Sequence, residues 1–152
     1  MSKAKYLLIS AVVVGAIAAA VIWQQRVLVA ALPPRIVCAN QAEARAKAGP
    51  TAFPVLGTGS MAPFIPPAGK GSDPMTTVVA YAKADSLPFA GIKKGNLVIY
   101  RPKWANGLVI HQAASRDAGG WIMSGLNNAR SEDFERITEK EFVAIIGEVY
   151  VW

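Results

Sequence analysis

The chain has 152 residues, enough for one domain of ordinary size beside an apolar segment at its amino-terminal end. Its net charge of +6 comes from scattered basic residues rather than a basic stripe, so we expect no nucleic-acid partner, and an anionic membrane surface explains the charge equally well. With one cysteine, Cys38, and one histidine, His111, an internal disulfide is excluded, no metal cluster is visible, and no cofactor is expected.

The first predicted element is a transmembrane helix. Residues 6–23 contain no charged side chain and are long enough to cross the hydrocarbon core of a bilayer. Lys3 and Lys5 precede this run, which favours an amino terminus inside the cell and the remaining chain on the extracytoplasmic side. The alternative is a cleaved secretory signal, since small residues at 18–20 and 30–31 offer cleavage sites. The length of the run favours a retained single-pass anchor over residues 1–26.

The next segment, 27–54, is predicted to be a membrane-proximal linker. It is rich in Ala, Arg, Lys, Gln and Pro, and residues 41–48 are able to form a short helix. From residue 55 to 152 the pattern changes to short β-type runs separated by Gly, Pro and Asn. The fold class is therefore mainly β, with strands expected at 76–82, 96–101, 107–113, 121–124 and 143–152.

A candidate nucleophile lies in the segment GTGSMAPF, residues 57–64. A serine that attacks a carbonyl needs an exposed backbone that substrate can approach closely, and Gly57 and Gly59 on either side of Thr58 permit this for Ser60. Met61 is a flexible apolar side chain suited to lining a substrate pocket, and Pro63 stiffens the exit from the segment. Ser, Gly and Pro are also the residues of ordinary turns, so an incidental serine is the alternative.

A candidate general base lies in the second of two strands that form a predicted hairpin. The runs GNLVIY, residues 95–100, and GLVIHQAAS, residues 107–115, contain His111 in the second strand. A serine hydroxyl is a poor nucleophile until a base takes its proton, and an imidazole suits that role near neutral pH. The alternative is a half-buried strand histidine bonded to a backbone carbonyl.

The ordered set of motifs resembles the signal peptidase I family, in its endoplasmic-reticulum and archaeal-type branch. The set comprises GSMAP, GNLVIY, VIHQ, MSGLNN followed by acids, and EFVAIIGEVYVW. The resemblance implies a signal-peptidase-like β domain at 55–152 behind one amino-terminal transmembrane helix, with Ser60 as nucleophile and His111 as base. It also implies that Met61 and Pro63 belong to the substrate-binding segment.

The third catalytic group is less sharply indicated, because this chain departs from the family pattern. Gly95 is followed by Asn where the family has Gly-Asp, and residues 125–128 read GLNN where the family has Gly-Asp-Asn-Asn. In the family an acid shortly after the Asn-Asn pair orients the histidine, which makes Asp133 the candidate and Glu132 the alternative. A solvated acidic turn explains the same residues, and Asp117 is a further possible acid.

The implied activity is that of a membrane-anchored serine endopeptidase that cleaves signal or leader segments from exported precursors. The resemblance implies that the precursor binds as an added strand with small side chains before the cut, and a hydroxyl such as that of Thr58 could help to bind the oxyanion. Three other hypotheses stay open: a self-cleaving repressor-like protease, a non-catalytic binding module of the same fold, and a basic membrane-anchored interaction protein.

Overall fold

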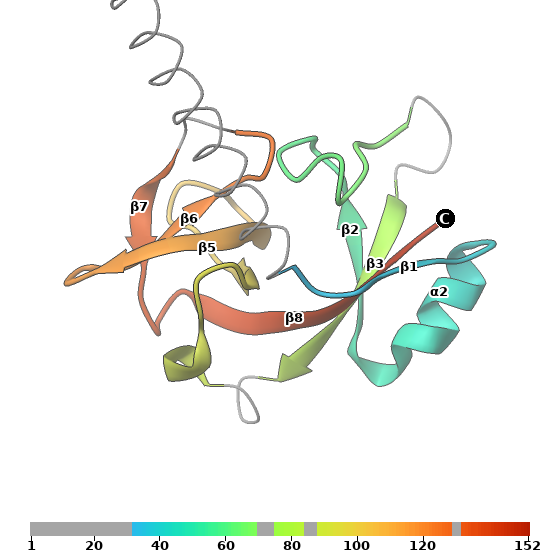
Figure 1. The fold of residues 1–152 in the computed structure, drawn as a ribbon, viewed down its shortest axis with the longest axis horizontal. Coiled ribbons are helices and arrows are strands. Elements are labelled where there is room, and N and C mark those ends of the chain that lie inside the picture. Colours follow the sequence, from blue (N-terminus) through green and yellow to red (C-terminus); the bar gives the residue numbers. More distant parts are fainter. Residues whose placement is uncertain (1–31, 70–74, 84–87, 129–131) are drawn as a thin grey trace, which may run out of the picture. The chain divides into compact units, whose positions relative to one another are not determined.

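The structure is a computed structural model that describes residues 32–69, 75–83, 88–128 and 132–152 (Figure 1). The predicted membrane anchor and the predicted signal cleavage sites lie outside these residues. Within the described part of the chain, no helix is both long enough and apolar enough to cross a bilayer. Residues Pro33–Trp152 form one unit, which is described here by itself.

The unit is built around one curled β-sheet, so the mainly-β prediction is confirmed. The strand order is β2-β3-β8-β4-β5-β6-β7, and β1 pairs in parallel with β8 beside this path. The strands are β1 (Arg35–Val37), β2 (Ala52–Leu56), β3 (Met75–Lys83), β4 (Leu97–Tyr100), β5 (Val109–Asp117), β6 (Gly120–Ser124), β7 (Glu132–Ile137) and β8 (Phe142–Val151).

Strand β8 joins the two halves of the sheet, as Figure 1 shows. Its first residues pair with β4, and most of its length pairs with β3. Strand β3, followed by β2, lies along one edge of β8, whereas β4, followed by β5 to β7, pairs with the first part of the opposite edge and β1 with its last part. All five predicted strands are present as β3, β4, β5, β6 and β8, with ends that differ by at most four residues, whereas β1, β2 and β7 were not predicted.

The segment predicted as a linker belongs largely to the folded unit, which begins at Pro33 rather than at residue 55. The predicted helix is present as α2 (Gln41–Ala48), and its first turn is capped because Asn40 Oδ1 accepts a hydrogen bond from Glu43 N at 3.0 Å. Ala44 and Ala48 are buried in one cluster with Tyr150 of β8. Small side chains let this helix pack closely on the sheet, which explains why an alanine-rich stretch is folded here.

A second cluster is formed by residues of β4, β5, β6, β7 and β8 together with Ile92. Its buried members are Ile92, Val98, Tyr100, Ala113, Trp121, Met123, Ile137 and Ile145. Strand β4 is buried along its whole length. This packing fixes the β4–β5 hairpin, which pairs antiparallel as predicted and carries the candidate base.

Candidate functional site

Ser60 begins a tight turn that Gly57, Thr58 and Gly59 separate from the end of edge strand β2. The turn is closed by backbone hydrogen bonds from Ala62 N to Gly59 O and from Ile65 N to Met61 O. Its outgoing end is tied back by a bond of 2.7 Å from Ala68 N to Gly57 O. A Cβ atom at Gly57 would lie 1.8 Å from Pro66 O, so only glycine permits this return of the chain. The turn presents Ser60 with its side chain partly accessible.

His111 is held in β5 at the position opposite Val98 of β4. Its side chain is 6% exposed, which is typical of a residue whose polar atoms have partners within the protein. Tyr100 lies two residues along β4 from Val98, so its ring is on the same sheet face as the imidazole. The candidate base therefore belongs to a paired strand rather than to a loop.

The structure brings the predicted nucleophile and the predicted base together, although 51 residues separate them in the chain. Ser60 Oγ lies 3.2 Å from His111 Nε2. The other imidazole nitrogen, Nδ1, lies 3.2 Å from the hydroxyl oxygen of Tyr100. Thr58 Oγ1 lies 3.3 Å from Ser60 Oγ, which places a second hydroxyl beside that of Ser60. A serine within hydrogen-bond reach of an oriented imidazole is the arrangement that acyl transfer requires.

The turn that carries the GLNN motif contacts the nucleophile segment directly. Asn127 N donates a hydrogen bond to Ser60 O at 2.8 Å, and Asn127 Nδ2 donates to Gly59 O at 3.2 Å. Gly125 approaches the same carbonyl so closely that a Cβ atom there would lie 2.7 Å from Ser60 O. The motif was recognised in the sequence, but its contact with Ser60 depends on tertiary structure and was not predicted.

The candidate acids fall at two different places. Asp133 and Glu132 belong to β7, and their side chains are outside the described part of the structure. Asp117 is at the far end of β5 from His111, where its carboxylate forms an ion pair with Arg136 at 2.5 Å. This hydrogen bond with Arg136 lowers the pKa of Asp117. Asp117 therefore does not reach the imidazole.

Asn96, which stands where the signal peptidase I pattern has an aspartate, does not disrupt its turn. The side-chain oxygen Oδ1 of Asn96 accepts a hydrogen bond from Lys93 N at 2.7 Å. Asn96 O in turn accepts a bond from Ala113 N of β5. An amide oxygen can fill this acceptor role as a carboxylate oxygen would, so the asparagine is compatible with the local fold.

Ser60 and His111 open into a cleft of about 780 Å³. Met61 lines it, whereas Pro63 is exposed and is not among the lining residues. No Asp, Glu, Lys or Arg is among the residues that the structure describes around the cleft. The lining residues are Phe53, Pro54, Val55, Leu56, Gly57, Thr58, Gly59, Ser60, Met61, Ile65, Met75, Trp104, Leu108, Val109, Ile110, His111 and Asn128.

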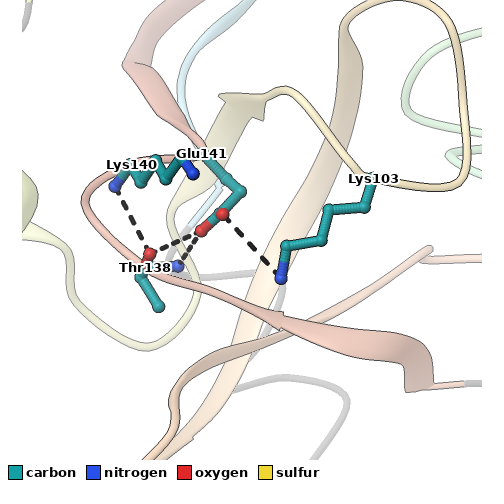
Figure 2. Close-up of polar contacts among 4 residues, drawn as sticks. All are labelled: Lys103, Thr138, Lys140 and Glu141. Carbon is teal, nitrogen blue, oxygen red and sulfur yellow. Dashed lines mark hydrogen bonds and ion pairs between the residues drawn. The ribbon is translucent and has the colours of Figure 1, made fainter.

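The loop that carries Trp104 and Leu108 to the cleft also carries Lys103, whose ammonium group lies beside Glu141 in the turn before β8, as Figure 2 shows. Arg101 N donates to Glu141 O at 2.8 Å, and Lys103 Nζ lies 3.9 Å from Glu141 Oε1. Glu141 is only 7% exposed, and its other carboxylate oxygen accepts hydrogen bonds from Thr138 N and Thr138 Oγ1. These bonds lower the pKa of Glu141.

Across the described residues, no group of three or more His, Cys, Asp and Glu side chains is arranged to hold a metal ion. No protein-family model, curated protein or solved structure matches this chain.

Proposed function

We propose that the chain is a membrane-anchored serine endopeptidase of the signal peptidase I type, which cleaves signal or leader segments from exported precursors. One observation carries the proposal: Ser60 Oγ lies 3.2 Å from Nε2 of the sole histidine of the chain, at an apolar cleft. The two residues were selected from the sequence by their motifs, and the fold could have placed them far apart. The short distance between their side chains supports a catalytic dyad.

In the proposed reaction Ser60 Oγ attacks the scissile carbonyl carbon while His111 Nε2 takes the hydroxyl proton. The imidazolium then donates that proton to the leaving amine, and the peptide bond breaks to leave an ester on Ser60. A water molecule, deprotonated by His111, hydrolyses the ester and restores the serine. The Thr58 hydroxyl, beside Ser60 Oγ, is suited to donate a hydrogen bond to the oxyanion together with backbone amides.

The edge strand beside the cleft and the lining of the cleft support a substrate segment that is extended and uncharged. Strand β2 is the first strand in the sheet order and supplies Phe53 to Leu56 to the cleft wall. A peptide can add to such an edge as a further strand, with its backbone hydrogen-bonded and alternate side chains directed into the cleft. Among the described lining residues the sole ionisable group is His111, so a charged side chain at the cut would be desolvated without a partner.

The predicted membrane anchor and its orientation in the bilayer are also part of the proposal. Residues 1–26 would hold the domain at the bilayer on the extracytoplasmic side, where the apolar segment of a precursor emerges. The membrane and the precursor are thus the two partners.

The test uses the full chain in liposomes with a model precursor whose leader ends in Ala-x-Ala. Ser60→Ala and His111→Ala should each lower the cleavage rate by at least about 10⁴-fold, and the double variant should lose no more than either single variant, because the two residues act as one unit. Ser115→Ala, an exposed serine on the same strand as His111, is the matched control and should cleave normally.

Cleavage by Ser60→Ala at the wild-type rate would refute the proposal. Precursor binding without cleavage, and no acylation of Ser60 by a peptidyl acylating reagent, would indicate the non-catalytic binding module. Cleavage within the chain itself, with the precursor left intact, would indicate the self-cleaving alternative.

A further inference from the structure

Tyr100 supplies a partner for His111 that the motifs do not assign. Its hydroxyl oxygen lies 3.2 Å from His111 Nδ1, on the side of the ring away from Ser60. The Tyr100 side chain is completely buried and belongs to the cluster formed with Val98, Ala113 and Met123. Its position is therefore set by core packing, which gives the hydroxyl little freedom to turn away from the imidazole.

The tautomer of the imidazole decides whether His111 can act as a base. A neutral imidazole has one nitrogen that donates and one that accepts. To take the proton of Ser60, Nε2 must be the acceptor, so the ring proton must be on Nδ1 and needs an acceptor there. A phenolic oxygen accepts as well as donates, and Tyr100 is placed to receive that hydrogen bond.

We propose that Tyr100 is a positioning residue of the dyad: its hydroxyl oxygen accepts a hydrogen bond from Nδ1–H of His111 and so keeps Nε2 unprotonated, as the acceptor of the Ser60 proton. The inference rests on the proposed function for its catalytic meaning, but the tautomer itself is a property of the resting protein. It assigns to a neutral phenol a role that the family resemblance gives to an acid.

The structural test uses the single histidine of the chain. The full chain, labelled with ¹⁵N-histidine and held in detergent micelles, gives two imidazole nitrogen signals that need no assignment to a residue. In the neutral imidazole, the wild type should show a protonated Nδ1 and an unprotonated Nε2. Tyr100→Phe, which keeps the ring and its packing, should convert this spectrum to a mixture of the two tautomers.

Tyr150→Phe is the matched control, because it removes another buried tyrosine hydroxyl, which donates to Glu148 and has no part in the dyad. Its imidazole spectrum should match that of the wild type. A wild-type spectrum with the proton on Nε2, or an unchanged spectrum in Tyr100→Phe, would overturn the proposal.

Kinetics supply the second measurement. Tyr100→Phe should lower kcat for the model precursor by about tenfold, the loss expected for one neutral hydrogen bond, and leave KM unchanged. An unchanged kcat, or a loss that appears in KM alone, would contradict a positioning role. Failure of this inference is distinguishable from failure of the proposed function, because the tautomer is measured without cleavage and the Ser60→Ala comparison does not involve Tyr100.

Discussion

Substitution of Gly125 by alanine tests whether the GLNN turn positions the nucleophile. The new Cβ atom would lie 2.7 Å from Ser60 O and 2.9 Å from Asn128 Nδ2, whereas ordinary van der Waals contact begins at 3.4 Å. The Ser60 carbonyl must therefore retreat by more than half an ångström, or the turn must move away from it. Either movement lengthens the hydrogen bond of 2.8 Å from Asn127 N to Ser60 O.

Two effects of different size should follow from Gly125→Ala. Forcing one methyl group into a closely packed contact costs about 1–3 kcal/mol of unfolding free energy, which lowers Tm by several degrees. The decrease in cleavage rate should be larger than this loss of stability alone would cause, because displacement of a reacting group by about 1 Å can cost on the order of a hundredfold in rate. We expect kcat to fall at least tenfold in protein that remains folded at the assay temperature.

Thermal unfolding and precursor cleavage are measured on the same preparations, with Gly91→Ala as the control. A Cβ atom at Gly91, in the 3₁₀ turn η2 (Phe89–Gly91), meets no atom within 4 Å, so this variant should retain both stability and activity. Equal activity of Gly125→Ala and Gly91→Ala would refute the argument that the turn fixes Ser60.

Two further predictions concern carboxylates. If a carboxylate also orients His111, as the resemblance implies, Asp133→Asn should lower kcat by orders of magnitude and Glu132→Gln should have little effect. A large loss in Glu132→Gln alone would assign the orienting role to Glu132. Normal cleavage by both variants would exclude both acids. The hydrogen bonds from Thr138 lower the pKa of Glu141 below its ordinary value of 4.5. The ionised form of Glu141 therefore stabilises the fold above pH 4.5, and this stabilisation is lost as the pH falls through the lowered pKa. Glu141→Gln should therefore reduce Tm at pH 7, and the difference in Tm from the wild type should narrow at acidic pH. Glu139→Gln, at an exposed position, is the control and should show neither effect. A difference in Tm that does not change with pH would contradict this account.

The sequence predicted the elements whose local pattern is strong. The β4–β5 hairpin has two apolar β-branched runs bounded by glycine, and it was predicted with its partner strand. Strand β2 was not predicted, because AFPVL contains a proline that lowers its strand propensity, although an edge position tolerates it. Strand β7 was missed for a related reason, since the acidic sequence EDFERI also fits a solvated turn.

The candidate site could be predicted only where a motif specifies it. Ser60 and His111 were chosen from local sequence, yet their distance of 3.2 Å depends on contacts between segments far apart in the chain. Asn127 holds the Ser60 turn from one side, and Arg35 Nε donates to Phe64 O at 3.0 Å from β1. Neither contact has a local signal, because each joins residues at least 29 positions apart.

Tyr100 shows why a site residue can be hidden in an apolar pattern. In LVIY it ends a run of four buried residues, and a tyrosine at that place is typical of a core position. Only the register, which sets Val98 opposite His111, places the Tyr100 ring on the imidazole face two residues away. A shift of the pairing by one residue would turn Tyr100 to the other face of the sheet and remove the hydroxyl from Nδ1. The core residues that fix this register therefore also fix the orientation of His111, so stability and the proposed catalysis should be coupled at this hairpin.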